Sequence, residues 1–207
     1  MRIDDNLNLV LPVREDDNGN GLAWAIHSPI SREAFEASFR ILSLARTEIF
    51  SKGTAYAFGT GPNVATLVLK EEGRRDGDLR GEPDPEKASR SLLAEIRRLT
   101  MIVAPSPEGF RPVPVDSAIA SGLISPEEWE DAENSLVFFT LTFCLAKRTK
   151  WAMAKKATAE ILGGQMVSST ATEWAASCRT STPPASILEE ESSATFSAPS
   201  PVQTFPM

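Results

Sequence analysis

The stretch SPEEWEDAENSLVFFTLTFCLA, residues 125–146, decides the fold of this chain. Its first four residues form a capping box, because the hydroxyl of Ser125 can accept from the free amide at the third helical position while Glu128 reaches back. Pro126 then occupies the first helical position, where a proline costs no hydrogen bond. From Leu136 onward the stretch is apolar on every side of a helix, so the helix has to be buried on every side. We expect it to be the central helix of the domain or part of a protein interface.

The beginning of the chain has the pattern of a β-hairpin. Apolar residues alternate with more polar ones over residues 7–13 and again over residues 22–26, which is the periodicity of strands. The intervening DDNGNG, residues 16–21, is rich in residues that tolerate the positive φ of tight turns. Pro29 cannot donate to a sheet, so the second strand should end before it. We predict an N-terminal β-hairpin within residues 1–30.

Residues 31–180 show helical spacing of apolar residues and are predicted to be a helical domain that forms one globular unit with the hairpin. Helices are expected to begin at or near Ser31, Pro62, Asp84, Pro126, Trp151 and Thr170. The helix from Asp84 should bury one face, formed by Leu92, Ile96, Leu99 and Val103. The charged, glycine-punctuated residues 70–84 predict an exposed, mobile loop, and the prolines of residues 105–114 predict a stiff connector.

Residues 181–207 differ in composition from the rest of the chain. They are rich in Ser, Pro and Thr, and their scattered apolar residues show no period. Such a segment cannot bury enough apolar surface to fold alone, so it predicts a disordered, flexible C-terminal tail. The expected fold class is therefore mainly α, with an N-terminal β-hairpin, a bundle of about five or six helices and this tail.

Composition limits the classes of partner. The 207 residues carry 28 acidic against 21 basic side chains, a formal net charge of −7, and this argues against nucleic acid as the main partner. The longest apolar run, Leu136–Ala146, has about half of the ~20 residues that a membrane-spanning helix needs. Cys144 and Cys178 lack the spacing of a disulfide framework, and the acidic N-terminus lacks a signal peptide. We expect no membrane contact and a location inside the cell.

Residues that could carry chemistry are few. His27 is the only histidine, so a catalytic triad or a zinc site would have to recruit it, and a strand-edge position beside Pro29 is the simpler interpretation. Residues 16–21 resemble the first half of an EF-hand loop, but the twelfth position is His27, where calcium needs a carboxylate. Gly59–Asn63 precede a helix without the Gly-Lys-Ser/Thr of a P-loop. We expect no catalytic residue, metal or cofactor, with an enzyme using carboxylates alone as the remaining alternative.

Large aromatic residues are the candidates for protein binding, because exposed aromatic side chains anchor many interfaces. The candidates are Trp129, Phe138, Phe139, Phe143, Trp151 and Trp174. Packing in the core is the alternative for each of them. A basic cluster that could meet an acidic partner, or simply face solvent, comprises Lys147, Arg148, Lys150, Lys155 and Lys156.

Several segments together resemble a known family. They are IDDNLNLV (residues 3–10), HSPISREAF (27–35), LLAEIRRLT (92–100), TEW (172–174) and RTST (179–182). In order and spacing of elements, residues 1–182 resemble tail assembly chaperones of long-tailed bacteriophages. This family has no catalytic motif, so no functional residue can be transferred to a position of this chain.

The resemblance implies a non-enzymatic role in the cytoplasm of an infected bacterium. Proteins of this family bind the hydrophobic tape measure protein, recruit tail tube subunits, and are absent from the mature virion. A longer form made by programmed ribosomal frameshifting would suit the tail that begins near Pro183. The alternative is a structural accessory protein of the virion head or tail, and self-association into a homo-oligomer stays open.

Overall fold

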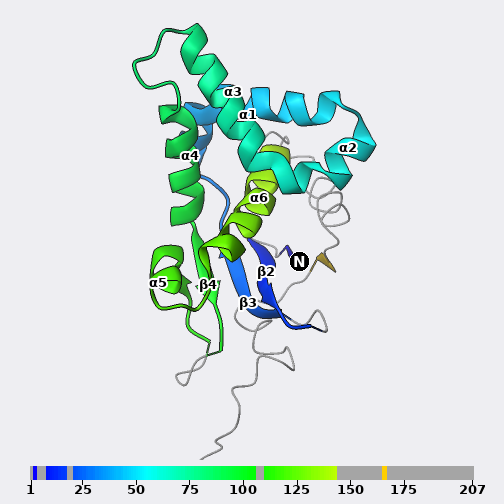
Figure 1. Ribbon diagram of the computed structural model, residues 1–207, viewed down its shortest axis with the longest axis vertical. Helices are drawn as coiled ribbons and strands as arrows, with labels where there is room; N and C mark the ends of the chain where they lie inside the picture. Colours follow the sequence, from blue (N-terminus) through cyan, green and yellow to red (C-terminus); the bar gives the residue numbers. More distant parts are fainter. Residues whose placement is uncertain (1, 4–7, 18–20, 106–109, 144–164, 167–207) are drawn as a thin grey trace, which may run out of the picture.

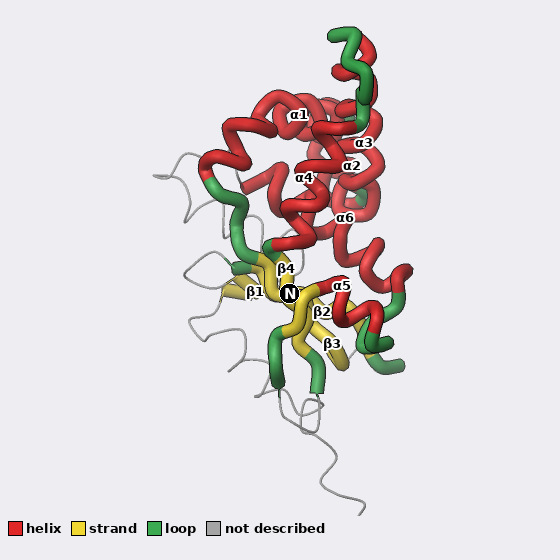
Figure 2. The backbone as a smooth tube through the Cα atoms, turned by 90° about the vertical axis from the view of Figure 1, so that its left-hand side faces the viewer, coloured by secondary structure: helices red, strands yellow, loops and turns green. Residues whose placement is uncertain are grey.

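The computed structural model describes residues 2–3, 8–17, 21–105, 110–143 and 165–166 of the chain. Helices predominate in these ranges, as the sequence predicts. They are α1 (Arg32–Ser51), α2 (Thr54–Gly59), α3 (Gly61–Leu79), α4 (Lys87–Arg98), α5 (Val115–Ala120) and α6 (Pro126–Phe143). Helices α1 to α4 gather on one side of the strands, and α6 runs from the strands toward α1 and α3 (Figures 1 and 2).

The strands form one sheet that contains more than the predicted hairpin. They are β1 (Arg2–Ile3), β2 (Leu9–Glu15), β3 (Gly21–His27), β4 (Thr100–Val103), β5 (Val113–Pro114) and β6 (Gln165–Met166), in the order β5-β4-β3-β2-β1-β6. Strands β2 and β3 pair antiparallel with Leu11 opposite Ala25, which confirms the hairpin, and β3 ends before Pro29 as expected. Only β1 and β6, among the pairs that the structure describes, run parallel.

The hairpin and the helices share one hydrophobic core. Leu9 of β2, Ala25 of β3, Leu42 of α1, Ile96 of α4 and Phe138 of α6 are all fully buried in it. Strand β3 also pairs with β4, which comes from the middle of the chain. Residues 1–30 therefore contribute the first strands of a larger unit and have no core of their own.

The predicted helical face that ended at Val103 is wrong in its last part. Helix α4 buries Leu92 and Ile96 as expected, but it ends at Arg98. Residues 100–103 are strand β4, whose register on β3 places Val103 opposite Trp24. The reason is tertiary: β-branched residues fit a half-buried pleated surface, and a neighbouring strand is available to pair with them.

The predicted mobile loop is wrong for residues 70–79, because α3 continues through them to Leu79, and residues 80–84 lie between α3 and α4. The glycines that suggested a loop are contact positions on this helix. A Cβ on Gly73 would lie 2.9 Å from Cβ of Ser89, and a Cβ on Gly77 would lie 2.4 Å from Cα of Pro85. The two glycines let the segment around α4 approach the α3 backbone, so they are used for packing rather than for flexibility.

The capping box and the buried helix are confirmed. The Ser125 amide donates to Glu128 Oε2 at 2.6 Å, and the Glu128 amide donates to Ser125 Oγ at 3.1 Å. Arg14 of β2 also donates to both carboxylate oxygens of Glu128, at 2.6 and 2.9 Å, and thereby links the start of α6 to the sheet. Leu136 to Leu141 are buried within the domain, which favours the central helix over the interface helix.

Several predictions lie outside the described residues. These are the helices expected near Trp151 and Thr170, the basic cluster of residues 147–156, Cys144 and Cys178, and the tail of residues 181–207. They stay predictions.

Candidate functional site

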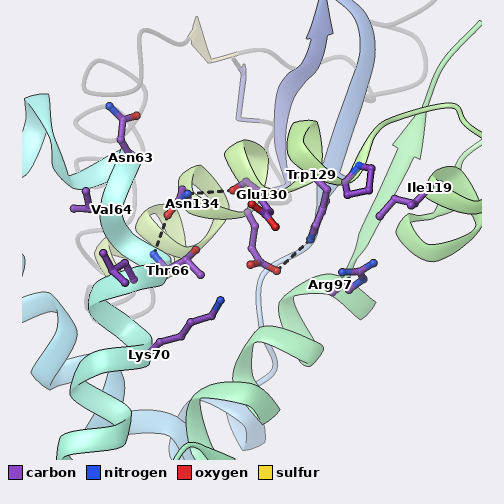
Figure 3. A pocket seen from close by; sticks show the side chains of 12 residues that line it. Asn63, Val64, Thr66, Lys70, Arg97, Ile119, Trp129, Glu130 and Asn134 are labelled. Atoms are coloured by element: carbon purple, nitrogen blue, oxygen red, sulfur yellow. Dashed lines mark hydrogen bonds between the residues drawn. The ribbon is translucent and has the colours of Figure 1, made fainter.

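A cleft of about 510 Å³ lies between α3 and α6 and is bounded by α4 and α5; this size is typical of ligand sites (Figure 3). Helix α3 contributes one wall, α6 the other, Arg97 of α4 and Ile119 of α5 the end. Its lining mixes apolar and charged groups: Asn63, Val64, Thr66, Leu67, Lys70, Arg97, Ile119, Pro126, Trp129, Glu130, Glu133 and Asn134.

Helical spacing on α6 aims its polar side chains at the cleft. Trp129 and Glu133 are four residues apart, so they are neighbours on one face, and Trp129 Nε1 donates to Glu133 Oε1 at 3.2 Å. Asn134 joins the two walls, because its Oδ1 accepts from the Thr66 amide of α3 at 3.1 Å. Its Nδ2 donates to the Glu130 carbonyl at 3.1 Å. One hydrogen bond, from Thr66 to Asn134, therefore joins the two walls of the cleft.

Arg97 is fully engaged within the protein. Its guanidinium donates to Asp116, with Nε 2.9 Å and Nη2 2.6 Å from Oδ1. The guanidinium carbon also lies 5.4 Å from the centroid of the Trp129 ring, a cation–π distance. Arg97 consequently lies over the face of Trp129 and pairs with Asp116 rather than with Glu133.

Glu133 and Lys70 face the cleft from opposite walls without such engagement. Among the described residues neither takes part in an ion pair within 4.0 Å. Burial raises the pKa of Glu133, and the positive charge of Lys70, the Trp129 hydrogen bond and Arg97 act against this rise. The cleft thus contains a half-buried carboxylate whose charge is incompletely compensated.

Thr66 is a further polar residue of the α3 wall, which also carries Lys70. Its side chain is 7% exposed, and its Oγ1 is buried without a hydrogen-bond partner among the described residues. A buried hydroxyl in this state costs free energy unless something binds to it. Thr66 is therefore a lining residue whose hydroxyl has unused hydrogen-bonding capacity among the described residues.

Three of the candidates for protein binding lie in the core, which is the alternative that the sequence left open for them. Trp129, Phe138 and Phe139 are at most 3% exposed because α6 is packed on every side. Trp129 contributes to the cleft as a wall and as a hydrogen-bond donor. Phe143 is the last residue of α6, and Trp151 and Trp174 lie outside the described residues.

His27 is not the strand-edge residue that the sequence suggested. It lies on an interior strand, between Leu9 of β2 and Thr100 of β4, and is fully buried. Its Nδ1 is 2.9 Å from Oγ1 of Thr100, and that hydroxyl donates to the Ile96 carbonyl at 2.7 Å, so Nδ1 carries the hydrogen. Burial lowers the pKa of His27 to about 4, against a smaller opposite effect of the Ile96 carbonyl.

This buried histidine predicts a loss of stability in mild acid. The pKa of His27 is about 4 in the folded chain and 6.5 in its ordinary environment, so the unfolded chain binds more protons between these values. Its contribution is complete above pH 6.5 and is lost as the pH falls toward 4, by about 2–3 kcal/mol. Denaturant unfolding at pH 7 and pH 4.5 should show this, and H27Q should remove most of the difference. An equal pH dependence in both proteins would contradict the assignment, since all carboxylates are the same in the two chains.

The remaining motifs have structural roles. The EF-hand-like residues 16–21 connect β2 to β3, and their flanks are strands as expected. Gly61 of the Gly59–Asn63 segment is the first residue of α3, where a Cβ would lie 2.8 Å from the Phe138 ring. Among the described residues no group of three His, Cys, Asp or Glu side chains could hold a metal ion. None of the helices in the described ranges combines the length and the apolar character of a membrane span.

With the cleft defined, the chain was compared with known proteins. It matches no protein-family model, no curated protein and no solved structure. Any proposal for its function therefore depends on the geometry above and on the resemblance of the sequence.

Proposed function

We propose that this chain is a non-enzymatic tail assembly chaperone of a long-tailed bacteriophage, which binds the tape measure protein and recruits tail tube subunits. The observation that carries the proposal is the cleft between α3 and α6, where the exposed Leu67 lies beside Glu133 and Lys70, which form no ion pair among the described residues. Protein interfaces combine apolar contacts with a few oriented polar groups in this way.

Leu67 is the clearest apolar contact point of the cleft. It lies on α3 with 67% of its surface exposed, and Val64 and Ile119 line the cleft beside it. A helix that lays its apolar face into a groove buries side chains of this kind. The tape measure protein is a suitable occupant, because its hydrophobic helices need cover before the tail is assembled.

The proposal predicts that a charge on the rim blocks the complex. Co-expression with the tape measure protein of the same genome should yield a soluble complex, and L67E should reduce its recovery by about tenfold or more, because the new carboxylate would be buried in the interface. Leu79 provides a matched control, since it is 80% exposed on the same helix but does not line the cleft. L79E should leave recovery unchanged.

Two outcomes would contradict this function. If the tape measure protein and the chain never co-purify, the chaperone assignment is wrong. If mass spectrometry finds the chain in purified particles at stoichiometric amounts, the structural accessory protein of the head or tail replaces it. Equal recovery with L67E and the unchanged chain would retain the chaperone but place its binding surface elsewhere.

A further inference from the structure

The α3–α6 cleft contains a carboxylate, Glu133, that lacks a direct cationic partner among the described residues. Glu133 is half-buried, and its one described hydrogen bond comes from a neutral donor, the Trp129 indole. Arg97, the guanidinium that lines the cleft, forms its ion pair with Asp116 and none with Glu133. An ionised carboxylate in a partly buried site gains more from a direct cationic donor than from charges at a distance.

A second, independent observation points to the same missing group. Thr66 is a lining residue of the cleft, and its Oγ1 is buried without a hydrogen-bond partner among the described residues. Since a hydroxyl has two acceptor lone pairs, it can accept from an N–H group that enters the cleft. A cationic group with several N–H donors would satisfy Glu133 and Thr66 together.

The apolar part of the cleft defines what should carry this cation. Val64, Leu67 and Ile119 line the cleft together with the two polar acceptors. Lysine and arginine side chains match a lining of this kind, because their aliphatic stem packs on apolar surface and their charged end donates to acceptors. The volume of about 510 Å³ holds a few side chains rather than a whole helix.

We propose that the α3–α6 cleft is a receptor site for a lysine or arginine side chain of a bound protein, with the cation on Glu133 and the stem against Leu67. This inference rests on the function proposed above and names the chemistry of the partner surface. Lys70 lies on the opposite wall and competes with the incoming cation for Glu133. The Lys70 side chain has to turn toward solvent when the cation binds.

Small probes test the site without the partner. N-acetyl-arginine amide and N-acetyl-lysine amide should shift the indole N–H resonance of Trp129 in a saturable way, because this group donates to Glu133. The neutral analogue N-acetyl-citrulline amide should bind about tenfold more weakly or not at all, since it lacks the charge. Comparing the arginine and lysine probes shows which cation fits.

Variants of α6 and α3 complete the test. E133Q retains an acceptor for Trp129 but should weaken both cationic probes about tenfold or more, whereas E127Q, in the exposed first turn of α6, should bind like the unchanged chain. K70M should bind the cations more tightly, because it removes the competing charge. Equal binding of arginine and citrulline probes, or binding unaffected by E133Q, would overturn the inference.

The same variants separate this inference from the proposed function. Loss of tape measure protein from the complex in E133Q, with E127Q unaffected, supports both. Undiminished co-purification with E133Q overturns the inference and leaves the chaperone function standing. Probe binding that depends on Glu133, without any complex with the tape measure protein, overturns the chaperone function and leaves the cation site, which then serves another protein.

Discussion

Replacing Phe138 by alanine is expected to lower the free energy of unfolding by about 4 kcal/mol. The ring is fully buried at the centre of the domain, and it stacks on Phe50 of α1 with centroids 6.4 Å apart. Helix α3 meets it so closely that a Cβ on Gly61 would lie 2.8 Å from the ring. Its neighbours belong to other helices packed at native density, so the substitution leaves a cavity that they fill only in part.

Chemical unfolding monitored by circular dichroism measures this effect. Phe39 provides the matched control, because it lies on α1 and is 51% exposed. F39A should cost about 1 kcal/mol or less, since most of its ring already contacts water. A loss of similar size for F138A and F39A would show that α6 is not the central helix of the core.

Replacing Gly77 by alanine is expected to lower the free energy of unfolding by about 3 kcal/mol. The new methyl group would lie 2.4 Å from Cα and 2.6 Å from the carbonyl oxygen of Pro85. Both are backbone atoms, so relief requires the segment around residue 85 to move away from α3. That movement would also disturb the nearby contact of Gly73 with Ser89.

Two other glycines calibrate the measurement of G77A. A Cβ on Gly73 would lie 2.9 Å from Cβ of Ser89 and 3.7 Å from its backbone nitrogen, which is less severe than the 2.4 Å at Gly77, so G73A should cost less than G77A. Gly59, at the end of α2, has no atom within 4 Å of the added Cβ, and G59A should be neutral or stabilising by up to about 1 kcal/mol. If G77A unfolds at the same denaturant concentration as G59A, the close approach of residue 85 to α3 is wrong.

The fold was predictable wherever local chemistry and tertiary packing agree. The capping box at Ser125 and the hairpin ending before Pro29 depend on neighbours in sequence, and both are confirmed. Strand β4 was missed because Leu99 and Val103 also have helical spacing, and only the distant partner β3 decides between the two states. Gly73 and Gly77 led to the wrong prediction of a loop for a similar reason, since the sequence does not distinguish a glycine in a tight helix contact from a glycine in a loop.

The candidate site was much less accessible from the sequence. From the sequence the aromatic residues of α6 could be either core or contact residues, and sequence alone could not show that Trp129 and Phe138 are buried. Glu133 looked like one of several acids near a helix start. The four-residue interval from Trp129 was a usable signal, because it places an indole donor beside this carboxylate. The contributions of Lys70 and Thr66 depend on how α3 crosses α6, which no short motif encodes.

The parallel pair of β1 and β6 gives the chain an order of assembly. Arg2 pairs with Gln165 and Ile3 with Met166, so a strand made among the first residues receives this neighbour only after α1 to α6 have all been synthesised. Until then β1 has a free edge, and unpaired strand edges are templates for other chains. A chain that ends within α6 would leave that edge uncovered. The late strand thus covers β1 only in chains extended past residue 166.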